Sequence, residues 1–152
     1  MAAPVTASGF REEVKGRIEQ LHDQATKLVS ELDRGGSFQE DRWDRPGGGG
    51  GVSRMLSDGK TFEKAGINRS TVRGALSVDL ARRIGAHWSG QGEADFFATG
   101  LSLVVHPRSP MVPTIHLNVR YFEIIGPSGE PLDAWFGGGT DLTPTYPYPE
   151  DA

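Results

Sequence analysis

The sequence contains no cysteine, which excludes disulfide bonds, iron–sulfur clusters, thiolate zinc sites and a cysteine nucleophile. No apolar run approaches the ~18 residues that a membrane-spanning helix needs. No basic segment followed by an apolar stretch marks a secretory signal. We therefore expect a protein without a membrane span that is located in the cytoplasm.

Positive charge is missing from the last part of the chain. The 152 residues carry 16 Lys and Arg against 20 Asp and Glu, and residues 121–152 hold six carboxylates and no cation. Nucleic-acid-binding proteins usually have a clustered basic stripe, so we expect no nucleic-acid partner. Twelve of the 16 cations are arginine. Arginine binds carboxylates in a bidentate manner, although a codon bias would give the same count.

The chain length predicts one domain, which we divide into four consecutive parts. These are a loose terminus at 1–8, a helix at 9–34, a glycine-rich segment at 37–51 and mainly antiparallel strands at 52–152. The helix is predicted because apolar residues recur at spacings of three and four. Ser8 is its expected N-cap, and Gly35 and Gly36 are expected to end it.

Five consecutive glycines at 47–51 follow a cluster of charged and aromatic residues. No Lys-Ser or Lys-Thr follows them, so the phosphate-binding Walker pattern is absent. The run fits either a flexible linker or a backbone that passes close to a flat ligand. Because Trp43, Arg45 and Arg54 flank it, we expect the run to be ordered near the functional site.

Two turns and a short helix are predicted further along the chain. Asp58-Gly59 lies between two short strands, at 52–56 and 61–64, and is typical of a type I′ hairpin. Residues 77–88 are expected to form a short helix that is capped by Ser77 and interrupted by the glycine-rich residues 89–92.

Polar residues are predicted to gather on one face of two strands. Residues 101–106 are rich in β-branched side chains, and residues 114–123 alternate strictly between polar and apolar. Side chains of a strand have a period of two. If the two strands pair antiparallel, one face carries a polar patch. Its members are Ser102, His106, His116, Asn118 and Arg120.

The residue types of this patch suit the recognition of an acid by Arg120 and proton transfer by a histidine, which titrates near neutral pH. Asp141 follows three glycines, so its carboxylate could lie directly against a ligand. His106, His116 and Asp141 also match the residue types of a two-histidine, one-carboxylate metal site. The alternative is that the histidines only form hydrogen bonds within the sheet.

Five motifs resemble one enzyme family, the oxygen-dependent coproporphyrinogen III oxidases, and they occur in the order found in that family. The motifs are WDRPGGGGG at 43–51, FEKAG at 62–66, LVVHP at 103–107, PTIHLNVRYF at 113–122 and WFGGGTDLTP at 135–144. The resemblance covers roughly residues 36–152 and corresponds to the N-terminal half of the family domain. It implies an α+β fold, in which a flat antiparallel sheet is flanked by helices, and a homodimer.

The resemblance also implies a reaction. The family converts two propionates of coproporphyrinogen III to vinyl groups by oxidative decarboxylation in haem biosynthesis, giving protoporphyrinogen IX. Molecular oxygen is the co-substrate, no organic cofactor is needed, and a divalent metal is a possible requirement. The implied substrate-binding residues are Ser102, Asn118, Val119 and Arg120; the implied catalytic residues are His116, Asp141 and Arg120; and the implied metal ligands are His106 and His116.

Three interpretations remain open from the sequence. The chain is half of the oxidase domain and inactive alone, since the C-terminal half of the family domain is absent from it. Alternatively, it is a non-catalytic fragment that binds a tetrapyrrole or carboxylates. If the resemblance is set aside, it is a non-haem iron oxygenase.

Overall fold

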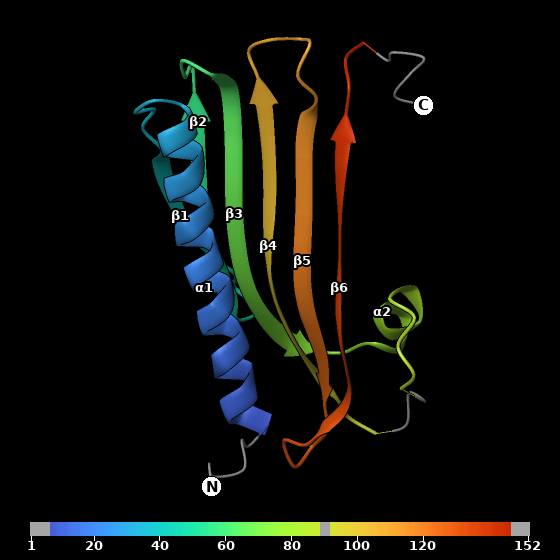
Figure 1. Ribbon diagram of the computed structural model, residues 1–152. Helices are drawn as coiled ribbons and strands as arrows, with labels where there is room; N and C mark the ends of the chain where they lie inside the picture. Colours follow the sequence, from blue (N-terminus) through green and yellow to red (C-terminus); the bar gives the residue numbers. More distant parts are fainter. Residues whose placement is uncertain (1–6, 89–91, 147–152) are drawn as a thin grey trace, which may run out of the picture.

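The computed structural model describes residues 7–88 and 92–146 as a single six-stranded antiparallel sheet with helices on its faces (Figure 1). The elements are α1 (Ala7–Leu32), β1 (Gln39–Asp44), β2 (Gly49–Ser57), β3 (Phe62–Ala75), α2 (Val78–Arg83), β4 (Asp95–Pro107), β5 (Thr114–Ile125) and β6 (Pro131–Thr143). The strands lie side by side in sequence order, and every neighbouring pair is antiparallel. The predicted α+β class with an antiparallel sheet is therefore confirmed.

The long helix α1 lies along one face of the sheet and contacts β3 and β4 (Figure 1). Its apolar stripe, which includes Ile18 and Val29, packs on buried strand residues such as Leu56, Ile67 and Leu101. None of the helices among residues 7–88 and 92–146 combines the length and the apolar character needed to cross a membrane.

The start of α1 differs from the prediction. The helix begins at Ala7, so Ser8 lies inside its first turn instead of preceding it as an N-cap, and residues 7 and 8 are not part of a loose terminus. The first turns are anchored by distant strand residues. Arg11 donates two hydrogen bonds, of 2.9 and 2.8 Å, to the buried carboxylate of Glu123, and Tyr121 donates a third from its hydroxyl group at 2.9 Å.

The hairpin between β2 and β3 is confirmed, but its turn is longer than predicted. Ser57 pairs with Lys64 instead of with a residue directly after Gly59, and Gly59 lacks the positive φ of a type I′ turn. The reason is the buried carboxylate of Asp33. It accepts hydrogen bonds from three successive backbone N–H groups of the loop, those of residues 60–62, at 2.7–3.1 Å.

Several elements have different lengths from those predicted. β3 and β4 are 14 and 13 residues long, because antiparallel pairing continues through glycine positions that have low strand propensity. The pairing of 101–106 with 114–123 is confirmed. α2 spans six residues; it begins after Ser77, whose hydroxyl accepts the N–H of Leu80, and Gly85 follows with φ of +69°. Residues 89–91 of the predicted interruption lie outside the described residues.

The two helices pack on opposite faces of the sheet. α2 and the segment after it cover Phe96, Phe122 and Trp135, which alternate along their strands with the residues that face α1. Phe122 stacks on both Phe96 and Trp135, with ring centroids 5.6 and 4.9 Å apart. We call the face opposite α1 the open face. α2 covers one end of it, and the rest carries the predicted polar residues.

Candidate functional site

The register of the sheet places the predicted polar patch together on the open face. Ser102 lies directly opposite Asn118, and Val104 lies opposite His116, so the even-numbered residues of β4 and β5 share one face. β6 adds Asp141, which lies directly opposite His116. The predicted grouping is therefore confirmed as an arrangement across three neighbouring strands.

His116 and Asp141 form a hydrogen-bonded pair. The distance between His116 Nδ1 and Asp141 Oδ1 is 2.8 Å, and Thr143 donates to the same oxygen at 3.2 Å. The hydrogen bond from His116 is the main reason that the pKa of Asp141 is lowered below its usual value. A carboxylate only accepts hydrogen bonds, so Nδ1 carries the hydrogen and Nε2 of a neutral ring is the free base.

Arg120 is held by a neutral partner. Its Nε and Nη2 donate to the carboxamide oxygen of Asn118 at 3.0 and 2.8 Å. No ion pair joins Arg120 to a carboxylate within residues 7–88 and 92–146. The guanidinium is oriented by Asn118 while its charge is left for a ligand.

A cavity of about 840 Å³ lies over the polar patch, and a second cavity of about 380 Å³ adjoins it. Ser102, Asn118 and Arg120 line both cavities, so the two form one continuous groove across the open face. Gly137 and Gly139 lie opposite Arg120 and Asn118 and line the larger cavity. A Cβ at Gly139 would meet no atom within 4 Å, so the floor of the groove is bare backbone there.

Two of the predicted site residues are placed differently from the others. Val119 lies on the face that packs against α1, where it contacts the core cluster, so its side chain takes no part in the patch. His106 lies on the open face, with its ring centroid 6.4 Å from that of His116, but it lines neither cavity of the groove. Its Nδ1 lies 3.4 Å from the hydroxyl of Thr114.

A metal centre does not follow from this arrangement. In the part of the chain that the structure describes, no group of three or more His, Cys, Asp or Glu side chains could hold a metal ion. His106 and His116 are two potential ligands without a third, and His116 uses one ring nitrogen for Asp141. The residues present therefore do not fit a metal site by themselves.

The glycine run is ordered, which makes the linker interpretation wrong. Gly47 and Gly48 form the turn between β1 and β2, and residues 49–51 belong to β2. A Cβ at Gly51 would lie 2.5 Å from the ring of Trp43. The flat group that approaches this backbone is thus a side chain of the same chain. Trp43 lines the smaller cavity together with Arg120, whereas Arg54 points to the α1 side and pairs with Asp23.

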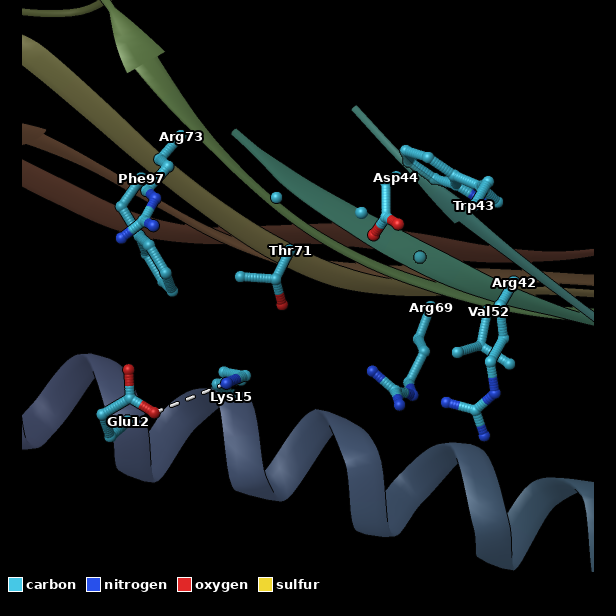
Figure 2. Close-up of a pocket in the computed structure, with 13 residues that line it drawn as sticks. Glu12, Lys15, Arg42, Trp43, Asp44, Val52, Arg69, Thr71, Arg73 and Phe97 are labelled. Atoms are coloured by element: carbon cyan, nitrogen blue, oxygen red, sulfur yellow. Dashed lines mark ion pairs between the residues drawn. The ribbon is translucent and has the colours of Figure 1, made fainter. Parts of the chain in front are cut away.

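The glycines of β2 also form part of a separate pocket on the α1 side, shown in Figure 2. This pocket has a volume of about 400 Å³, and arginines of β1 and β3 point from the sheet toward α1. Most of its cations are paired with carboxylates. The pairs are Lys15–Glu12 at 3.6 Å, Arg42–Glu40 at 2.6 Å and Arg69–Glu19 at 3.1 Å. It is therefore a less suitable anion site than the groove.

Sequence reasoning missed two polar residues of β3 that line the smaller cavity, Asn68 and Ser70. Asn68 lies opposite Ser102, whereas Trp43, which lines the same cavity, had been singled out beside the glycine run. The available signal was the spacing of Asn68 and Ser70, which share a face on a strand. It was overlooked because the flanking glycines weakened the strand pattern.

Comparison with known proteins decides the family. The family description "Coproporphyrinogen III oxidase" matches residues 13–152. The chain belongs to the coproporphyrinogen III oxidase family. The match begins before residue 36, where the motif resemblance started, and so includes most of α1.

Relatives of this family resemble the chain along nearly its whole length. It is 44% identical over 156 residues to coproporphyrinogen-III oxidase 1, chloroplastic, of Arabidopsis thaliana, covering 97% of this chain and 40% of that protein. It is 45% identical to the oxygen-dependent oxidase of Drosophila melanogaster, covering 100% of this chain and 42% of that protein. For the human mitochondrial oxidase the identity is 42%, covering 100% and 36%. The chain thus spans about two fifths of the length of these relatives.

Proposed function

We propose that this chain supplies the substrate-binding and proton-transfer face of an oxygen-dependent coproporphyrinogen III oxidase. The proposal rests on the groove on the open face, in a chain that belongs to this family. In this groove, an arginine that has no carboxylate partner among the described residues lies four residues along β5 from His116, which pairs with Asp141 of β6. The substrate is a flexible macrocycle with four carboxylates, which suits a groove that combines bare backbone with a free guanidinium.

The substrate carboxylates account for the position of Arg120. Its guanidinium is already oriented by Asn118, so little side-chain freedom is lost when it binds a propionate. Ser102 lies directly opposite Asn118 and offers a hydroxyl group to the same carboxylate or its neighbour. Val119 contributes through its backbone only.

The reaction requires that each propionate loses carbon dioxide and one hydrogen from its β-carbon. With molecular oxygen as the oxidant, R–CH₂–CH₂–COOH and O₂ give R–CH=CH₂, CO₂ and H₂O₂, so atoms and electrons balance. We assign the proton transfer to Nε2 of His116, whose other ring nitrogen is occupied by Asp141. The carboxylate of Asp141 stabilises positive charge that develops on the electron-poor pyrrole.

Oxygen is proposed to react with the bound substrate without an organic cofactor. A divalent metal is not part of the proposed steps, because His106 and His116 do not form a set of three ligands with any described residue. Neither nucleic acid nor a membrane is a proposed partner.

Further proposals concern the oligomeric state, the cellular location and the turnover of the intact protein. A homodimer is proposed on the basis of the family resemblance. The cytoplasm is the proposed location, although the names of two relatives place them in the chloroplast and the mitochondrion; cell fractionation would decide this. The chain spans about two fifths of its relatives, so turnover is expected from the intact protein and not from residues 1–152 alone.

The test is turnover of coproporphyrinogen III by the intact protein in the presence of oxygen, followed by the fluorescence of the oxidised product. We expect protoporphyrinogen IX, and activity that is lost in Arg120→Met and His116→Ala variants. The conservative variant Arg82→Lys, on the exposed side of α2, is the matched control. Binding without turnover would favour the non-catalytic alternative, and one iron per chain with oxygenase activity on other substrates would favour a non-haem iron enzyme.

A further inference from the structure

A single row of polar residues crosses the open face at right angles to the strands. Each member lies directly opposite the next, so neighbouring side chains are about 5 Å apart. The row consists of Ser53, Asn68, Ser102 and Asn118. Asn118 and Ser102 are already proposed to bind substrate, and Asn68 is the next residue along the same line.

The carboxamide oxygen of Asn68 is buried and has no hydrogen-bond partner in the described part of the chain. A buried acceptor without a partner is costly and uncommon in folded proteins. One other such side-chain atom is found among residues 7–88 and 92–146, Nδ1 of His22, a residue of α1 that is buried against the sheet beside Ile67. Asn68 differs because it lines the smaller cavity of the groove, together with Trp43.

The carboxamide can present its oxygen to the groove without a change of fold. Its nitrogen lies on the open side, 3.9 Å from where a Cβ at Gly66 would be. Rotation about the last side-chain bond of asparagine is broad and roughly two-fold. A half-turn therefore exchanges nitrogen and oxygen. It moves the NH₂ group into the buried position in turn, so this orientation is favoured only while a donor on a bound ligand occupies the groove.

The chemistry of the proposed substrate decides which donor this is. At neutral pH the four carboxylates of coproporphyrinogen III only accept hydrogen bonds, and its pyrrole N–H groups are its donors. Asn68 on β3 and Asn118 on β5 are separated by one strand, β4. They are therefore about 10 Å apart at the usual spacing between neighbouring strands. A macrocycle that extends from a propionate bound by Arg120 toward β3 therefore places a pyrrole ring over Asn68.

We propose that Asn68 is a substrate-positioning residue whose carboxamide oxygen accepts a hydrogen bond from a pyrrole N–H, while Trp43 forms the apolar wall beside it. This inference rests on the proposed function. It assigns the smaller cavity to one pyrrole ring of the macrocycle and the larger one to the pyrrole that carries the reacting propionate. Asn68 acts by holding the ring in place and does not touch the carbon atoms that react.

The test is a calorimetric binding titration of the intact protein with coproporphyrinogen III under nitrogen, where no turnover occurs. Asn68→Leu is expected to weaken binding about tenfold, because the pyrrole N–H loses its acceptor. Asn68→Gln keeps a neutral carboxamide acceptor and should stay within about threefold of the parent. Gln24→Leu, the same change of side-chain type on the exposed side of α1, should leave binding unchanged.

A second ligand separates this inference from the proposed function. Butane-1,2,3,4-tetracarboxylate has carboxylates but no N–H group, so Arg120→Lys should weaken its binding and Asn68→Leu should not. Unchanged affinity of Asn68→Leu for coproporphyrinogen III, or an equal loss in Asn68→Gln, would overturn the role of Asn68 alone. Absence of coproporphyrinogen binding by the parent would overturn both. Asn68→Ala, which adds no bulk, replaces Asn68→Leu if that variant does not fold.

Discussion

Replacement of Arg120 by lysine tests the carboxylate-binding role most directly, because it keeps the charge and removes the geometry. Arginine has five N–H donors in a rigid plane. Two of them, on Nε and Nη2, bind the carboxamide oxygen of Asn118 at 3.0 and 2.8 Å, which leaves three for a substrate carboxylate. A lysine ammonium that keeps one bond to Asn118 has two donors left, and they do not lie in one plane.

The expected loss can be estimated from this difference. Truncation of one partner of a buried charge pair costs roughly 2–5 kcal/mol. Since lysine retains the charge and the site is partly open, we expect the lower end, about 2 kcal/mol, or a roughly thirty-fold fall in kcat/KM. Most of this fall in kcat/KM should result from a higher KM. Arg120→Met removes the charge as well and should approach the upper end, a fall of more than about 10³-fold.

The assay is steady-state turnover of coproporphyrinogen III by the intact protein, with thermal unfolding measured in parallel. Arg120 is exposed, so the melting temperature should not change, and Arg82→Lys should change neither quantity. Unchanged KM and kcat in Arg120→Lys would refute the proposal that Arg120 grips a propionate. A loss of kcat with unchanged KM would assign Arg120 to a different step.

Three further predictions concern catalysis, the groove floor and acid stability. His116→Ala and Asp141→Ala should each lower kcat by roughly 10²–10⁴-fold without a change in melting temperature, because the two side chains are 45% and 64% exposed; wild-type turnover in both would contradict the assignment. Gly139→Ala should fold and raise KM, since its Cβ enters open space, whereas Gly138→Ala should unfold more easily because its Cβ overlaps strand backbone; thermal melts and KM values check both. Burial raises the pKa of Asp33, but three backbone N–H donors outweigh this and lower it. Its contribution to stability is therefore complete above the unfolded pKa of about 3.9 and is lost as pH falls through the lower folded value. Asp33→Asn should cost roughly 2 kcal/mol in urea unfolding at pH 7 and remove that part of the acid dependence; an unchanged unfolding midpoint would refute it.

The residues on each face of β5 could be predicted because polar and apolar residues alternate within the strand itself. Alternation of polar and apolar residues over 114–121 assigns each side chain to one of two faces, and a shift of one residue would bury the polar groups. Pairing with residues 101–106 then brings Ser102 beside Asn118. These steps depend only on strand geometry, so the polar patch followed from the sequence without knowledge of the rest of the sheet.

The errors have a common physical cause, which is contact between residues far apart in the sequence. The turn at Asp58-Gly59 is shaped by Asp33, whose partners are 27–29 residues away. The first turns of α1 are held to the sheet by Arg11 through Glu123, 112 residues away. Neither contact leaves a local pattern, and propensity alone therefore gave a tight turn and a later helix start.

Glycine explains why part of the groove was harder to predict than the rest. Gly100 and Gly137 lie on either side of Arg120, and Gly139 lies beside Asn118. Glycine weakens a strand, because it orders at a high entropic cost and offers no side chain to pack. The glycines that leave space in the groove are thus the residues that weaken the strand pattern in the sequence. Glycines on two strands beside Arg120 therefore lower the stability of the sheet and leave open space around the guanidinium. This is expected at a functional site, where a bound ligand supplies the missing contacts.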